Sequence, residues 1–127
     1  MASIAIPQYS SYTSRAKATG AVAEISSTKT AIALCQADLG TFTGCNAGSN
    51  GVPTIAVTKN ITAVTSVTNG VISVTTGATD TASPAVNFTI IDTPTLPVGG
   101  ANMLWTNTGT VCDGGVRGLK AGQGDCP

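Results

Sequence analysis

Residues 4–17 read IAIPQYSSYTSRAK, and no glycine interrupts the chain before Gly20. Helical character continues from this stretch to about Leu34. One helix over residues 4–34 would be about 45 Å long at a rise of about 1.5 Å per residue, which is more than the width of a small domain. The stretch therefore predicts one long helix whose first half is held by something outside its own domain.

The first half of this helix carries an unusual set of side chains for a soluble helix. Pro7 removes one backbone donor and normally starts or kinks a helix. Tyr9 and Tyr12 follow one turn apart, and with Ala5 and Ala16 they form a narrow stripe at the spacing of packed helices. An ordinary helix N-terminus, with Pro7 in its first turn, would account for this spacing too.

Residues 4–9, followed by Tyr12 and Arg15, resemble the segment just after the membrane-inserted part of bacterial type IV pilins. In that family a long apolar run ends in alanine and isoleucine, then proline and tyrosine, and the helix continues into a globular head. Only residues 1–3 precede the segment here, so we expect a shortened chain without the insoluble part of the helix. The resemblance implies that five side chains face other subunits: Ile4, Ile6, Pro7, Tyr9 and Tyr12.

The composition indicates one compact head domain. The chain has 127 residues, of which 42% are hydrophobic and 9% are charged. Six basic and six acidic side chains cancel, which gives no reason to expect nucleic acid or an anionic membrane as a partner. We expect a surface protein that packs against copies of itself and meets a membrane only through the helix segment that the chain is expected to lack.

The second half of the helix should lie on a sheet. Lys29 is expected at the edge of the apolar stripe, with its ammonium in water. Gly20 is the weak point at which the helix can bend, and Gly40 suits a left-handed cap where the helix stops. The expected buried face consists of Ala18, Val22, Ile25, Ile32 and Ala33.

The remainder of the chain predicts an antiparallel sheet. Asn69-Gly70 indicates a tight hairpin, and Val86, Phe88 and Ile90 should meet the helix. Trp105 is expected as a large core residue. The β-branched runs lie at residues 54–58, 61–67, 71–76, 85–91 and 102–106. The resemblance implies the α+β ladle fold of pilins: a helix (4–34), an αβ-loop (35–60), a roughly four-stranded sheet (61–111) and a disulfide-closed D-region (112–126).

Four cysteines allow three pairings, and the sequence alone does not choose among them. Locality favours Cys35 with Cys45 and Cys112 with Cys126, because each bridge would close an irregular segment in an oxidising compartment. The second bridge would close a loop of about 15 residues, worth about 3 kcal/mol in the chain-entropy model. The cysteine spacing is far from the close pairs of a structural zinc site.

The glycine-rich C-terminal loop offers a candidate receptor-binding surface. Its charged side chains are Asp113, Arg117, Lys120 and Asp125. A structural staple that also contacts the next subunit is the alternative interpretation. Asp113 and Asp125 are candidates for paired catalytic carboxylates or calcium ligands. We prefer the interpretation that both lie at a solvated hairpin tip. Without a histidine the usual general base is missing, so we expect no enzymatic activity, no cofactor and no metal.

Together the residues and the resemblance predict a structural subunit of a type IV pilus on the cell surface, held in the inner membrane before assembly. The implied partners are other pilin subunits and the inner-membrane assembly machinery, with a host receptor or phage as further candidates. Adhesion, twitching motility and DNA uptake are the implied roles. The alternatives are a minor pilin or a type II secretion pseudopilin, which often binds calcium, and a free secreted binding domain stabilised by disulfides.

Overall fold

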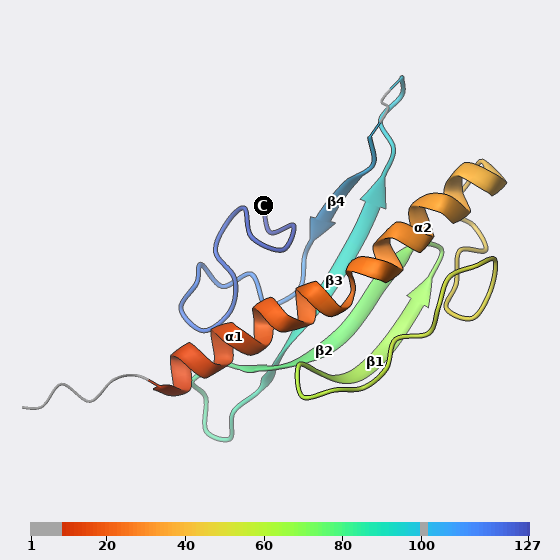
Figure 1. The fold of residues 1–127 in the computed structure, drawn as a ribbon. Coiled ribbons are helices and arrows are strands. Elements are labelled where there is room, and N and C mark those ends of the chain that lie inside the picture. Colours follow the sequence, from red (N-terminus) through yellow and green to blue (C-terminus); the bar gives the residue numbers. More distant parts are fainter. Residues whose placement is uncertain (1–8, 100–101) are drawn as a thin grey trace, which may run out of the picture.

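A computed structural model describes residues 9–99 and 102–127 (Figure 1). The elements are α1 (Tyr9–Glu24), α2 (Ser26–Leu39), β1 (Ile61–Thr68), β2 (Val71–Thr79), β3 (Asn87–Thr95) and β4 (Leu104–Asn107). The strands form one antiparallel sheet in the order β1-β2-β3-β4. Figure 1 shows the two helices as one long bent rod that crosses a face of this sheet. The α+β fold expected from the sequence is confirmed.

The helix bends at Ile25, between α1 and α2, where the backbone has φ −89° and ψ −2°. Hydrogen bonding continues through the bend, because the Ile25 N–H donates to Ala21 and the Lys29 N–H donates to Ile25, at 3.2 and 3.0 Å. The prediction of a bend at Gly20 is therefore wrong. Gly20 instead allows a close approach, since a Cβ there would lie 2.5 Å from Nδ2 of Asn60.

The helical segment ends later than Leu34, at Leu39. Gly40 follows with φ 72° and donates its N–H to the Gln36 carbonyl at 2.8 Å. This is the left-handed cap that the sequence predicted, and it satisfies one of the last helix carbonyls. The first residues of the predicted helix, 4–8, lie outside the described residues.

The core lies between the helix and the sheet. Ala18, Ile25 and Ile32 are buried, as predicted, whereas Val22 and Ala33 are half-buried. Burial of each of the larger side chains stabilises the fold by roughly 1.5 to 3 kcal/mol. The sheet contributes the buried side chains of Ile61, Val67, Ile72, Val74, Ala78, Phe88 and Ile90.

The described part of the chain forms four strands, and the predicted run at residues 54–58 is not one of them. Residues 53–56 and Thr58 line a groove with Glu24, Ser27 and Thr28, so the segment packs beside the helix instead of extending the sheet. Val86 was predicted to meet the helix, but it lies before β3, outside the sheet, and is 58% exposed.

The hairpin between β1 and β2 forms where the sequence predicted it. Asn69 and Gly70 both have positive φ, 49° and 82°, and Thr68 pairs with Val71 across the turn. Two consecutive left-handed residues are the requirement of a tight hairpin turn of this kind.

Candidate functional site

The candidate site consists of the exposed face of α1 and the C-terminal loop (residues 112–126) beside it, which Figure 1 shows next to each other. Tyr9 and Tyr12 are 70% and 68% exposed at the start of α1. The opposite face of the same helix buries Ser14, Ala18 and Ala21. Three other residues predicted to pack against subunits lie outside the described residues: Ile4, Ile6 and Pro7.

Two disulfides tie the irregular segments. Cys35 and Cys45 join the last turns of α2 to the following loop, with their Cα atoms 5.9 Å apart. Cys112 and Cys126 close the C-terminal loop, with a Cα separation of 5.6 Å. Both separations lie in the usual range for disulfides. The structure thus contains the two local bridges that the sequence favoured.

Arg117 and Ser14 dock the C-terminal loop onto α1 and β2. The Arg117 guanidinium donates from Nε to the Thr79 carbonyl at 2.7 Å and from Nη2 to the Thr79 hydroxyl at 3.0 Å. The same side chain reaches the hydroxyls of Ser10 and Ser11 on α1. The buried Ser14 hydroxyl lies 2.7 Å from the Arg117 carbonyl and accepts the Thr79 N–H at 3.0 Å. Three segments far apart in the chain therefore meet at one point.

The Asp113 carboxylate organises the loop from within. It accepts the backbone N–H groups of Gly115 at 3.0 Å, Arg117 at 2.9 Å and Gly118 at 3.0 Å. Bonds from several N–H groups to one carboxylate hold a turn without regular secondary structure. Asp113 is half-buried, so its carboxylate serves the internal structure of the loop.

Asn107, at the end of β4, holds the other end of the loop. Its Nδ2 donates to the Gly124 carbonyl at 3.1 Å, and its backbone N–H donates to the Asp125 carbonyl at 2.8 Å. Its Oδ1 accepts the N–H groups of Ile91 and Gly109. This buried side chain uses its donor and acceptor groups to join β3, β4 and the loop.

Lys29 of α2 meets two carboxylates. Its Nζ lies 2.5 Å from Asp125 Oδ2, 3.8 Å from Asp92 Oδ2 and 5.1 Å from the centre of the Trp105 ring. The prediction that the Lys29 ammonium ends in water is therefore wrong, because carboxylates surround it. Burial raises the pKa of Asp92 from 3.8 to about 7; a hydrogen bond with Asp125 and its charge act in the same direction, whereas the Lys29 charge lowers it.

Sequence reasoning missed Asp92, although a signal existed. The inward positions 88 and 90 of β3 continue with period two to 92, so the sheet directs this carboxylate toward the helix. The role of Thr79 carries no such signal, because it depends on docking of a segment far along the chain. Trp105 is half-buried beside Lys29, so it covers the polar cluster at the edge of the core.

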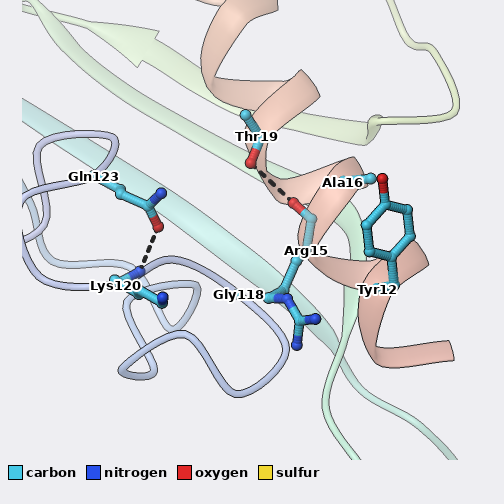
Figure 2. Close-up of a pocket in the computed structure, with 7 residues that line it drawn as sticks. All are labelled: Tyr12, Arg15, Ala16, Thr19, Gly118, Lys120 and Gln123. Carbon is cyan, nitrogen blue, oxygen red and sulfur yellow. Dashed lines mark hydrogen bonds between the residues drawn. The ribbon is translucent and has the colours of Figure 1, made fainter. Parts of the chain in front are cut away.

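A groove of about 460 Å³ separates α1 from the C-terminal loop. Figure 2 shows its lining residues, with Tyr12 and Arg15 on the helix and Lys120 on the loop. Arg15 Nη1 donates to the Val116 carbonyl at 3.1 Å, which closes part of the gap. The full lining is Tyr12, Arg15, Ala16, Thr19, Gly118, Lys120 and Gln123.

Of the four charged residues in the candidate receptor loop, three have intramolecular partners. Asp113 and Arg117 bond the loop and β2, and Asp125 bonds Lys29. Lys120 is exposed. Within residues 9–99 and 102–127, no group of three or more His, Cys, Asp or Glu side chains is arranged to hold a metal ion.

In this chain a bent helix with two exposed tyrosines packs on a four-stranded sheet beside a loop closed by a disulfide. Residues 14–118 match the family model described as pilin, a bacterial filament protein, and the chain therefore belongs to the pilin family. This is a structural family without enzymatic activity.

A curated relative supports this assignment. Over 75 residues the chain is 35% identical to the prepilin peptidase-dependent protein D of Escherichia coli (strain K12), a match that covers 59% of this chain and 51% of the relative. The matched region thus spans about half the length of that relative. No solved structure matches the chain significantly. In the part of the chain that the structure describes, the helices are too short or too polar to cross a bilayer.

Proposed function

We propose that this pilin-family chain is the major subunit of a type IV pilus and polymerises through its N-terminal helix into a surface fibre. The observation that carries the proposal is the pair of exposed aromatic side chains on α1, Tyr9 and Tyr12, on a helix whose other face is buried in the head. Aromatic residues are enriched in protein interfaces because each one buries a large area on association.

The proposed mechanism is assembly. Neighbouring copies pack their N-terminal helices together. Burial of the exposed aromatic face then offsets the loss of the contacts that the helix makes before assembly. The contacts of Arg117 and Ser14 fix the head relative to α1, so every copy enters the fibre with the same geometry. The proposed partners are other copies of this chain and the inner-membrane machinery that adds them to a fibre on the cell surface.

The choice of a major pilin over a pseudopilin rests on the C-terminal loop. The loop is closed by Cys112 and Cys126, and its shape is held by the Asp113 carboxylate and backbone N–H groups. A pseudopilin of type II secretion is expected to use calcium in this region instead. Metal analysis of the purified protein tests this choice: stoichiometric calcium, with stability that depends on it, would favour the pseudopilin.

We further propose that the main role of the loop is structural and that it also contacts the next subunit. The side chains of Asp113, Arg117 and Asp125 support the structural role, because they form hydrogen bonds within the chain. Adhesion, twitching motility and DNA uptake are the proposed roles of the fibre. Replacing Lys120 with alanine in intact fibres tests receptor binding by the loop. Unchanged attachment to host cells would remove this residue from any receptor site.

The assembly proposal is tested with variants of the gene in the bacterium that carries it. Tyr9→Ala and Tyr12→Ala together should reduce the yield of sheared surface fibres strongly, whereas the thermal stability of the head should change little, since both side chains are exposed. Val57→Ala, at a position that is 64% exposed outside α1, is the matched control and should leave the yield unchanged. Normal yield from the tyrosine variant would contradict the proposal.

A further inference from the structure

Lys29, Asp92 and Asp125 come from three separate parts of the fold: α2, β3 and the C-terminal loop. The Lys29 amine nitrogen is 2.5 Å from Asp125 Oδ2 and 3.8 Å from Asp92 Oδ2. The Lys29 amine therefore contacts the carboxyl groups of both aspartates, and Asp125 is near enough to raise the pKa of Asp92.

The three groups are shielded from water to different extents. The Asp92 side chain is 1% exposed, and its Oδ1 has no hydrogen-bond partner among the described residues. Lys29 and Asp125 are 22% and 26% exposed, and the Trp105 ring covers the amine. Burial raises the pKa of Asp92 to about 7, so this carboxyl group keeps its proton in mildly acidic solution and part of the time at neutral pH.

We propose that Lys29 and Asp125 condense into an intramolecular amide bond, with Asp92 as the acid that assists the step. Nothing in the assembly function requires this cross-link, so the inference goes beyond the proposed function. The bond would join α2 to the C-terminal loop next to the Cys112–Cys126 disulfide and would persist under reducing conditions.

The step balances without any co-reactant. A proton passes from the Lys29 ammonium to the Asp125 carboxylate, which gives a neutral amine and a neutral acid. The Nζ lone pair attacks Cγ of Asp125 while the Asp92 proton stabilises the carbonyl oxygen. A second Nζ proton leaves with the Cγ hydroxyl as water, and Asp92 ends protonated. One Nζ–Cγ bond forms, one Cγ–O bond breaks, and nothing is oxidised or reduced.

Proximity lowers the barrier to the step. Well-oriented groups within one molecule react at effective concentrations of about 10⁵ M or more, because the entropy of bringing amine and acid together has already been lost on folding. A buried general acid accelerates such steps by roughly a hundredfold to ten-thousandfold. The three side chains are held by the core, because Lys29 follows the buried Thr28 and Asp92 lies between Ile90 and Pro94 on the inner face of β3.

Intact-mass spectrometry of the folded chain tests the proposal. We expect a mass lower than the sequence mass, corrected for two disulfides, by one water molecule. Asp113-Gly114 can also lose water by forming a succinimide, so the site must be assigned in peptides. After reduction and trypsin digestion, the cross-link predicts a branched peptide joining residues 18–59, uncut at Lys29, to residues 121–127.

Three variants separate the roles of the groups, with circular dichroism as the check that each one folds. Lys29→Arg keeps the charge and should show no loss of water at this site. Asp125→Asn should form the same bond with loss of ammonia instead of water. Asp92→Asn should slow formation at least about a hundredfold. A folded wild-type chain with the unmodified mass, or without the branched peptide, would overturn the proposal.

Discussion

Arg117 in the C-terminal loop donates two hydrogen bonds to Thr79 at the end of β2, from Nε to the carbonyl at 2.7 Å and from Nη2 to the hydroxyl at 3.0 Å. The planar guanidinium presents its donors to two acceptors in a rigid fork, whereas an ammonium group donates from a single nitrogen on a flexible stem. The position of a loop without regular secondary structure therefore depends strongly on one side chain that also reaches α1.

Replacing Arg117 with lysine should loosen the loop and destabilise the head by about 1 to 3 kcal/mol, because the positive charge is retained while the paired bonds to Thr79 are lost. Urea unfolding measures the loss, and hydrogen exchange of the loop amides locates it. Lys120→Met is the control, since Lys120 is exposed and its side chain should contribute little. Equal stability of Arg117→Lys and the wild type would show that the hydrogen bonds between Arg117 and Thr79 contribute little to the stability of the head.

The buried carboxyl of Asp92 predicts an unusual pH dependence. Its pKa is 3.8 in the unfolded chain and about 7 in the fold, so the folded chain holds a proton that the unfolded chain has released. This contribution, about 4 kcal/mol, is complete below about pH 4 and is lost as the pH rises through about 7. Asp92→Asn, compared in the Lys29→Arg background where no amide can form, should flatten the slope.

Denaturant unfolding between about pH 4 and pH 8 measures this effect. The difference in unfolding free energy between the chain that keeps Asp92 and its Asp92→Asn variant isolates the one carboxyl from other titrating groups. A difference that stays constant over the whole window would mean that Asp92 does not titrate differently in the folded and unfolded states.

Two glycines should respond differently to alanine. A Cβ on Gly77 would overlap the backbone carbonyl oxygen of Lys59, which cannot move alone, so Gly77→Ala should destabilise the head by about 1 to 3 kcal/mol. A Cβ on Gly20 would meet the side chain of Asn60, which can rotate away, and alanine improves helix propensity by about 1 kcal/mol. Thermal unfolding of Gly20→Ala should thus remain close to wild type, and a larger loss there than at Gly77 would refute the distinction.

Removing the bridge between Cys112 and Cys126 by a double serine replacement should lower the unfolding free energy by about 3 kcal/mol, since the unfolded chain gains the freedom of a loop of about 15 residues. The loop should stay docked, because Asn107 and Arg117 still hold it. Protection of the Leu119 amide, which bonds the Val111 carbonyl at 2.7 Å, reports docking. Exchange of this amide at the rate of an unfolded chain would contradict the expectation.

The sequence predicted the features that local chemistry decides. Asn69-Gly70 forms its hairpin and Gly40 caps its helix because few other residue types adopt positive φ there. The bend at Ile25 could not be predicted, since neither proline nor glycine marks it in the sequence. The contact between Ser14 and Arg117 spans 103 positions and exists only after the loop docks.

The exposed aromatic face of α1 was open to prediction, whereas the charged cluster between α2, β3 and the C-terminal loop was not. The exposed tyrosines at positions 9 and 12 follow from helical spacing and the resemblance to pilins. The cluster of Lys29 with two carboxylates was missed because a basic residue at the edge of an apolar stripe normally reaches water. Only the alternation of β3, extended by one step to Asp92, pointed to a partner.

A photo-crosslinking amino acid at position 12 of the subunit in surface fibres tests the central claim most directly. The account predicts a dimer band on denaturing gels, with both cross-linked peptides derived from this chain, whereas the same probe at Val57 should give far less. Position 12 is 68% exposed on α1 and lines the groove beside the C-terminal loop of its own chain, so a cross-link within one subunit leaves a monomer band and only a neighbouring copy gives the dimer band. Fibres that show no cross-link from position 12, or a cross-link to a different protein, would contradict assembly through this helix.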